Sequence, residues 1–192
     1  SALVEANASS LTGHHALTLF YLHVDADDAE GVHRQKLDRI MQTIRTTGDG
    51  SRQHPYRLLS RADARLFVSN SGDQLVGDIY QSNSADPLQL LILSRPNENS
   101  PISSTYFDLS DLINSVGGAD GNPWDVLRIL ADAEDTAAQA AIGTYLARQQ
   151  RYEPALRWLE LASRDENLLA HTLLARIYWY QSGLVNPSAD AT

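Results

Sequence analysis

Histidine and aspartate side chains gather near the amino end of the chain, where they could hold a metal ion. Imidazole nitrogens and carboxylate oxygens are ligands that zinc and other divalent metals prefer. No His-x3-His or His-Glu-x-x-His spacing is present, and Asp27 is expected to cap a helix. We therefore expect no metal site, and interpret the group as solvated polar residues at a corner between a strand and a helix. Its members are His14, His15, His23, Asp25, Asp27, Asp28 and His33.

Motifs for nucleophilic catalysis or phosphate binding are not found in the sequence. An activated serine would need a Gly-x-Ser-x-Gly turn, whereas the Ser-Gly pair at residues 71–72 is typical of an ordinary turn. Asp108 and Asp111 could act as an acid–base pair, but the default interpretation is a loop residue and a helix cap. We expect no catalytic residue and no cofactor. A hydrolase with its site around His23 and Asp25 remains an alternative.

Aromatic residues cluster in the last helical segment and could bind a partner. Successive residues on a helix point about 100° apart, so Tyr178, Trp179 and Tyr180 cannot all face one core. Aromatic and arginine side chains are enriched at the energetic centres of protein interfaces. We expect a protein partner to contact this group, and the alternative is that it packs against the sheet or a further repeat. The predicted partner-binding residues are Trp158, Tyr178, Trp179, Tyr180, Arg157 and Arg176.

The composition is that of a folded, acidic protein. Hydrophobic residues make up 43% of the chain, charged residues 20%, and the net charge is −9. Because phosphate binding needs a basic surface, we expect no nucleic-acid partner. The longest apolar run, residues 87–93, is too short for a membrane helix, so we expect no integral membrane segment. Proteins are the expected partners, and no small-molecule ligand is expected.

The chain contains no cysteine, which excludes disulfides and thiolate chemistry. This composition is compatible with a periplasmic or otherwise exported bacterial protein. The chain begins with Ser1 and a run of small residues, so a removed signal peptide is one interpretation of its start. A cytoplasmic location is the alternative.

Residues 14–116 are expected to form a small α+β domain. Residues 16–24 are rich in β-forming side chains and apolar on both faces, which favours a central strand. Asp27 and Glu30 have the spacing of a capping box, and apolar residues at helical spacing then predict a helix over residues 29–46. Further strands are expected at residues 55–60, 65–69, 74–80 and 88–93, with a hairpin turn at residues 70–73. This order predicts an antiparallel sheet covered by one helix.

A connection rich in Asn, Ser, Gly and Pro runs through residues 94–123. Within it, Ser110 or Asp111 could cap a short helix that ends near residue 116. Beyond it the chain is expected to be helical, and Pro123 and Pro154 lie where proline is favoured at a helix start. The expected helices are residues 124–132, 136–149, 154–163 and 168–181.

Small residues recur among large apolar ones between residues 140 and 183. The pair Ile142-Gly143 recurs as Leu174-Ala175, 32 residues later. A second helix with matching spacing is marked by Tyr152, Ala155 and Ala162. On these residues the segment 136–183 resembles the tetratricopeptide and Sel1-like repeats, and the resemblance implies short stacked helices that bind other proteins. An ordinary helical hairpin, or a repeat array that continues beyond this segment, remains open.

The expected architecture is an α+β protein made of consecutive parts. They are a leader at residues 1–13, an α+β domain at 14–116, a linker at 117–123 and a helical repeat-like region at 124–192. The expected function is a noncatalytic adaptor or scaffold of an exported bacterial assembly. An immunity or inhibitor protein is an alternative, because an acidic surface can cover a basic partner.

Overall fold

The computed structural model describes residues 10–81, 88–117, 122–165 and 167–181 of the 192-residue chain. Residues 10–81 contain α2 (Leu11–His23), α3 (Asp27–Arg45), β1 (Tyr56–Arg57), α4 (Arg61–Ser69) and β2 (Gln74–Gln81). Residues 88–117 contain β3 (Gln89–Arg95), β4 (Ser103–Asp108) and α5 (Ser110–Gly117). The remaining elements are α6 (Pro123–Asp132), α7 (Thr136–Arg148), α8 (Tyr152–Ala162), the 3-10 turn η1 (Ser163–Asp165) and α9 (Leu168–Gln181). No helix within these ranges is long and apolar enough to cross a membrane.

The four strands form one mixed sheet in the order β1-β4-β3-β2. β3 pairs antiparallel with both neighbours, and Ile92 lies opposite Asp78 on one side and Thr105 on the other. β1 pairs with the end of β4 in parallel. The predicted α+β class is confirmed, but the predicted fully antiparallel sheet is wrong. The helix α4 carries the chain from β1 to β2, and strands joined by such a crossover run in the same direction.

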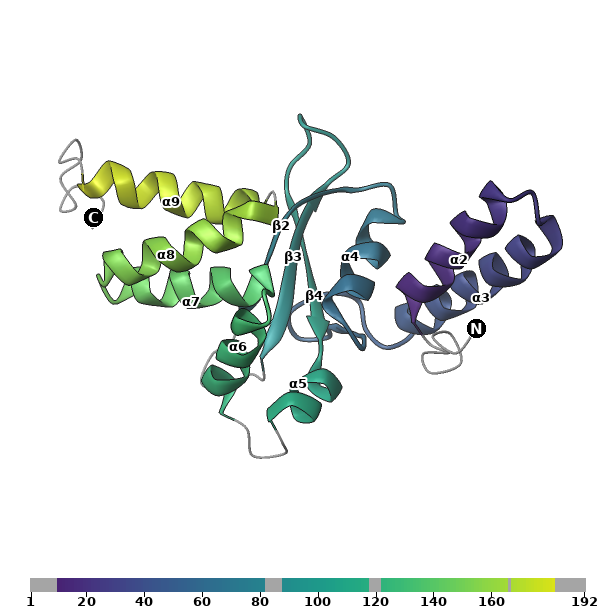
Figure 1. The fold of residues 1–192 in the computed structure, drawn as a ribbon, viewed down its shortest axis with the longest axis horizontal. Coiled ribbons are helices and arrows are strands. Elements are labelled where there is room, and N and C mark those ends of the chain that lie inside the picture. The colour runs from purple at the N-terminus through teal and green to yellow at the C-terminus, as the bar shows by residue number, and fades with distance from the viewer. Residues whose placement is uncertain (1–9, 82–87, 118–121, 166, 182–192) are drawn as a thin grey trace.

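The central strand β3 is buried between helices. Leu90 and Ile92 have no exposed surface. In Figure 1 the sheet stands between α4 and the helices α7, α8 and α9. On the α4 side, Phe67 meets Phe107 of β4 edge to face, with ring centroids 5.9 Å apart. Burial of the apolar side chains of β2 and β3 against these helices stabilises the fold.

Residues 16–23 are helical and Val24 is the C-cap, so the strand predicted for residues 16–24 is wrong. They belong to α2, which begins where the Ser10 side chain accepts a hydrogen bond from the Gly13 amide at 3.1 Å. The buried residues Leu11, His14 and Thr18 follow a helical spacing. The segment is apolar all round because its other faces carry exposed apolar side chains, and this removed the periodicity that marks a helix. Residues 1–9 of the expected leader lie outside the described residues, and residues 11–13 open α2.

Residues 65–69 are also helical rather than extended. They form most of α4, whose first turn is capped by the Ser60 side chain accepting from the Asp63 amide. Ala64, Phe67 and Val68 are buried on one side of this helix. The predicted hairpin turn at residues 70–73 therefore joins a helix to β2, and Gly72 has a positive φ of 88° there.

The helix predicted for residues 29–46 is present as α3, but its predicted cap is wrong. Ala26 is the N-cap and makes no side-chain cap hydrogen bond. Asp27 lies inside the first turn, where its negative charge is favourable beside the positive end of the helix dipole. Glu30 pairs with Arg34 instead of reaching back to the cap.

The remaining predicted elements match the structure closely, apart from one missed strand. The predicted strands at 74–80 and 88–93 are β2 and β3, the short strand at 55–60 contains β1, and the four carboxy-terminal helices are confirmed within two residues. Pro123 opens α6 as predicted, whereas α8 begins two residues before Pro154. β4 was read as part of a connection because its first half, Ser-Ser-Thr, is polar.

Two helical arms extend from opposite sides of the sheet (Figure 1). One arm is the antiparallel hairpin of α2 and α3, and the other is the group α6 to α9. α7 and α9 both pack on the edge strand β2, so the carboxy-terminal helices are joined to the sheet. The expected linker at residues 117–123 falls between α5 and α6, and residues 118–121 lie outside the described residues.

Gly143 marks the closest approach of α7 and α8. A Cβ placed there would lie 2.6 Å from Leu159 Cγ and 3.2 Å from the Ala155 carbonyl oxygen. We expect Gly143→Leu to overpack this contact and lower the free energy of unfolding by about 1–3 kcal/mol. Urea unfolding monitored by circular dichroism measures this change.

The matched control is Gly31→Ala on α3, where a Cβ would meet nothing within 4 Å. Alanine there should raise stability by up to about 1 kcal/mol, because it is the better helix former. Equal stability of Gly143→Leu and the wild type would contradict the close packing of α7 on α8.

Candidate functional site

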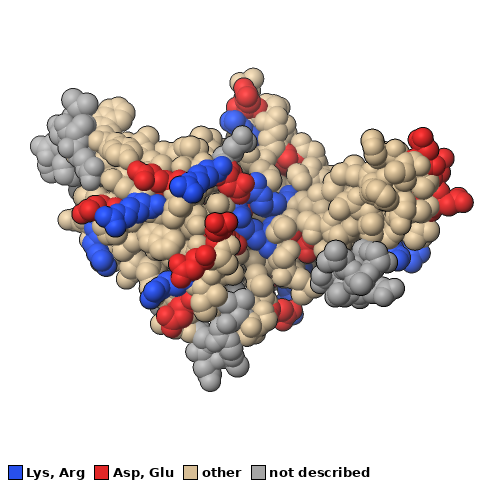
Figure 2. Space-filling view, in the orientation of Figure 1, with Lys and Arg blue, Asp and Glu red and all other residues tan. Residues whose placement is uncertain are grey.

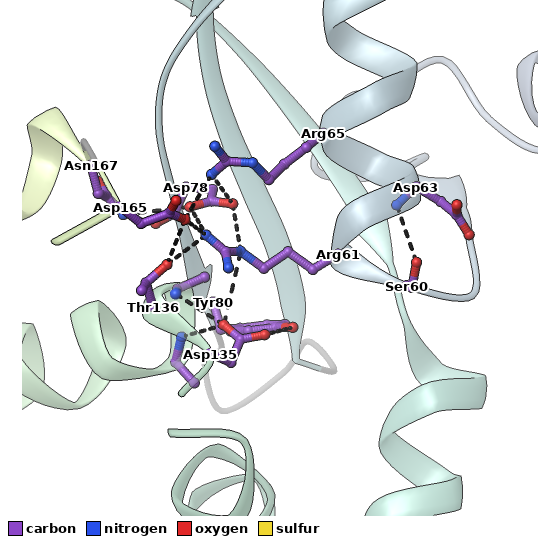
Figure 3. A network of polar contacts seen from close by, with 12 residues as sticks. Ser60, Arg61, Asp63, Arg65, Asp78, Tyr80, Asp135, Thr136, Asp165 and Asn167 are labelled. Atoms are coloured by element: carbon purple, nitrogen blue, oxygen red, sulfur yellow. Dashed lines mark hydrogen bonds and ion pairs between the residues drawn. The ribbon is translucent and has the colours of Figure 1, made fainter. Parts of the chain in front are cut away.

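Arg61 occupies the junction between the sheet and the carboxy-terminal helices (Figure 3). From the first turn of α4 its guanidinium donates two hydrogen bonds to Asp78 of β2, Nε to Oδ2 at 2.7 Å and Nη2 to Oδ1 at 2.9 Å. Asp78 is 1% exposed. A planar guanidinium and a carboxylate fit each other in this two-point arrangement, which is stronger than a single hydrogen bond.

Further bonds tie the pair to the start of α7 and to η1. Arg61 Nη2 also donates to Thr136 Oγ1 at 2.7 Å and to Asp165 Oδ2 at 3.1 Å. Thr136 Oγ1 donates to the same Asp165 oxygen at 3.0 Å. Arg65, one turn along α4, contacts Asp78 at 3.3 Å and Asp165 at 3.5 Å. Two arginines therefore neutralise two aspartates across three elements.

Asp135 adds the N-cap of α7 to this network. Its Oδ1 accepts from the amides of Ala137 and Ala138, and its Oδ2 accepts from the Tyr80 hydroxyl at 3.3 Å. Burial raises the pKa of Asp135, although Arg61 and the Ala138 amide act in the opposite direction. Burial also raises the pKa of Tyr80, and the neighbouring Asp135 raises it further.

The surroundings of Arg61 and Asp165 shift the pKa of each group in the direction that favours its charged form. Burial alone would lower the pKa of Arg61, but its bonds to Asp78 and the charges of Asp78 and Asp135 raise the pKa overall. Burial would raise the pKa of Asp165, but the Arg65 charge and the hydrogen bonds from Thr136 and Arg61 lower it overall. Both groups therefore remain charged near neutral pH.

Asn167 connects this network to α9. Its Nδ2 donates to the Asp78 carbonyl at 2.8 Å, and its Oδ1 accepts from the Ala170 amide at 3.4 Å in the first turn of α9. A Cβ on Gly77 would lie 2.5 Å from Asn167 Oδ1, so β2 needs glycine at the contact. The amide of Asn167 thus bridges a strand and a helix terminus whose backbone groups would otherwise lack partners.

The network is a joint rather than an open reaction centre. Two polar hollows of about 380 Å³ each flank it, and both have Arg164 and Asp165 in their walls. Arg61, Asp78 and Asp135 already bond to one another, to hydroxyl groups or to helix amides. We therefore interpret these residues as the support that orients the carboxy-terminal helices on the sheet.

Sequence reasoning missed this joint because its partners are far apart in the chain. Arg61 and Asp78 are 17 residues apart, and Arg61 and Asp165 are 104 apart. One feature could have revealed it. Asp78 is a lone charge inside an otherwise apolar strand, and a charge buried there requires a partner.

The predicted partner-binding residues lie on α8 and α9 with different degrees of exposure. Trp158 is half-buried and packs against the core. Tyr180 is half-buried, with the Arg176 guanidinium carbon 5.5 Å from its ring centroid. Tyr178 is 50% exposed and donates to Glu160 of α8 at 2.9 Å, while Trp179 is 59% exposed. The exposed Arg157 pairs with Glu153 on α8.

Trp179 belongs to a stripe along the solvent-facing side of α9. Leu168, Thr172, Ala175 and Trp179 are exposed and recur at spacings of four, three and four residues. That spacing places them on one face of a helix. Large apolar residues at both ends and small residues between them leave room for the backbone of another helix to approach closely.

Two members of the histidine and aspartate group near the amino end, His14 and His33, form a contact between helices. His14 and His33 share a hydrogen bond of 2.9 Å between their Nδ1 atoms, and Tyr21 stacks on His33 with ring centroids 5.5 Å apart. These contacts hold α2 against α3. Within the described ranges, no group of three histidine or carboxylate side chains is placed to hold a metal ion.

Comparison of the chain with protein-family models, with curated proteins and with solved structures finds no match. The functional interpretation therefore depends on the geometry of the described residues.

Replacement of Arg61 by methionine should destabilise the protein strongly, because it leaves the buried carboxylate of Asp78 with only two longer contacts, to Arg65 at 3.3 Å and to Asn167 at 3.4 Å. Breaking a buried ion pair in this way typically costs about 3–5 kcal/mol. The control Arg157→Met removes an ion pair whose side chains are 76% and 85% exposed, and it should cost less than about 1 kcal/mol. Urea unfolding of both variants measures the difference, and equal losses would contradict the structural role of the joint.

The contact between His14 and His33 should make stability depend on pH. Burial lowers the pKa of His33, and the charges of His14 and Lys36 lower it further. The unfolded chain then binds a proton more readily than the folded one, so this contribution is complete above a pH of about 6.5 and is lost as the pH falls below it. Between pH 7.5 and 5.5 the melting temperature should fall less for His33→Gln than for the wild type. The control His171→Gln, at an exposed site on α9, should follow the wild type.

Proposed function

We propose that the protein is a noncatalytic adaptor that binds another protein through the outer face of α9. The observation that carries this proposal is the exposed stripe of Leu168, Thr172, Ala175 and Trp179. A soluble helix normally turns such a face towards another element. The partner that fits is an amphipathic helix, which would place its apolar side chains over the small residues and against Trp179.

The surroundings of Trp179 suit it as an anchor. Tyr178 is held beside it by the bond to Glu160, and Arg176 is held by Tyr180. Side chains that are fixed before binding lose little conformational entropy when the partner arrives. A large aromatic group next to an arginine is also typical of the residues that dominate binding energy.

The support below α9 favours the same function. α7 and α8 pack through Gly143 and Leu159, and Asn167 ties the start of α9 to β2. The binding face therefore stands on a framework fixed to the sheet, which favours specific recognition. We also propose that these helices form a repeat of the tetratricopeptide or Sel1-like kind. In this arrangement α7 and α8 are one unit, and α9 is the first helix of a second.

The proposal also places the adaptor in an exported bacterial assembly. The cysteine-free composition is its support, since such a chain has no thiol to form a wrong disulfide in an oxidising compartment.

Truncation of Trp179 to alanine should weaken partner binding by about 2 kcal/mol or more, roughly thirtyfold in Kd. Proteins captured on the immobilised chain are identified, purified and titrated calorimetrically against the wild type and Trp179→Ala. The control is Ile102→Ala, because Ile102 is 51% exposed but lies before β4, away from α9. Circular dichroism checks that both variants are folded.

Undiminished affinity of Trp179→Ala for each purified partner would contradict the proposal. An equal loss in Ile102→Ala would also contradict it, since that result would assign binding to the sheet.

A further inference from the structure

The outer half of the α2–α3 hairpin carries a concentration of exposed apolar side chains. Twelve large hydrophobic residues are exposed among the described residues, and five of them lie on this hairpin or its turn. Each is exposed by 49–56%, and they are Leu19, Phe20, Leu22, Val24 and Val32. An apolar surface of this density on a projecting element is typical of an interaction site.

The hairpin is attached to the rest of the protein only at its base, as far as the described residues show. At the base, the amide and hydroxyl of Thr12 donate to Asp63 Oδ1 at 2.8 and 2.9 Å, and α3 ends beside β1. Figure 2 shows the viewed side of the hairpin as largely uncharged, with acidic residues at its outer tip. Phe20 and Val24, one helical turn apart, lie in this outer part.

The charges on α3 have opposite signs on the two sides of Val32. Asp28, Val32 and Lys36 are exposed and four residues apart, so they follow one side of the helix. At a rise of about 1.5 Å per residue, Asp28 and Lys36 each lie about 6 Å from Val32 along the axis. A two-fold axis through Val32, with the two α3 helices antiparallel, would place each Asp28 opposite Lys36 of a second copy.

The opposite arrangement is unfavourable. If two hairpins lay side by side in parallel, their tips would be adjacent. The acidic residues of the two tips would then face and repel each other. These residues are Asp25, Asp27 and Asp28. Charge complementarity therefore selects the antiparallel pairing, and we expect Phe20 of α2 to be covered in the same contact.

We infer that two copies of the chain pair through their α2–α3 hairpins as an antiparallel four-helix bundle with Val32 near the two-fold axis. A two-fold contact uses one surface twice, so that surface must complement itself. The side of α3 does so, because it is acidic at one end, apolar in the middle and basic at the other. Four helices that enclose an apolar centre are a stable arrangement.

Sedimentation equilibrium of the full chain tests the pairing. The wild type is expected to form a dimer, and Phe20→Asp should raise the dimer Kd at least about thirtyfold by placing a charge in the contact. The control Ile102→Asp makes the same change at a residue of similar exposure and should leave the Kd unchanged. Circular dichroism confirms that both variants are folded.

A charge exchange tests the antiparallel direction. Asp28→Lys alone, or Lys36→Glu alone, turns both attractive pairs of the dimer into repulsive ones and should raise the Kd about tenfold. The double variant Asp28→Lys/Lys36→Glu restores both pairs and should return the Kd close to the wild-type value. Simple damage to the fold would not be repaired by the second change.

Four outcomes would overturn the inference. They are a wild type that stays monomeric up to about 100 μM, a dimer that persists in Phe20→Asp, a double charge variant as weak as the single ones, and a monomeric wild type that sediments with phosphatidylcholine vesicles. The last result would assign the apolar face to a lipid surface.

Discussion

The two-point ion pair between Arg61 and Asp78 is the interaction on which the arrangement of the whole molecule depends. Removal of these charges from water is costly, and only close geometry with additional hydrogen bonds offsets that cost. The structure supplies both, because Thr136, Asp165 and Arg65 complete the pairing. The pair with all its additional bonds can exist only when α4, β2 and the start of α7 are assembled together. It therefore favours one relative orientation of the sheet and the carboxy-terminal helices over other compact arrangements.

The two arms are held to the sheet in different ways. The carboxy-terminal helices contact β2 through the network of Arg61, through Asn167 and through apolar packing of α7. The hairpin contacts the sheet region near Thr12 and Asp63 and at the end of α3. Beyond its base the hairpin is stabilised by contacts between α2 and α3 themselves, including the pair His14 and His33. Local opening should therefore be easier in the hairpin than in the other arm, since fewer buried contacts hold it.

Sequence patterns predicted the carboxy-terminal helices well, because the residues that determine where each helix lies are close to it in the chain. Proline at the start of α6 and small residues on α7 and α8 act within a few positions of their own element. The strands β2 and β3 were predicted for a similar reason, since their apolar runs lie between polar turns. The described ranges place Trp179 and Tyr178 at the surface, which leaves the predicted partner-binding role as a prediction.

Two helices were predicted as strands because their polar and apolar residues do not follow the pattern of a typical surface helix. α2 is apolar on its outer side as well as its inner side, so composition favoured a buried strand. α4 is only nine residues long, and the Leu-Phe-Val sequence at its end favoured a strand. The joint around Arg61 was not predicted from the sequence for another reason. Its bonds connect residues that no local pattern relates, and only the folded topology brings them together.

The two proposed interaction faces share one property, which is that both are exposed helix surfaces with large apolar side chains. α9 and the α2–α3 hairpin lie in opposite arms, separated by the sheet (Figure 1), so occupation of one face does not block the other. A dimer formed through the hairpins would carry two α9 faces on rigid supports. A partner with two suitable helices would then bind the second site at a high effective concentration, and avidity could exceed the affinity of one face by about 10²–10⁴-fold. Self-association at one arm would in this way strengthen the proposed adaptor function at the other without any new contact to the partner.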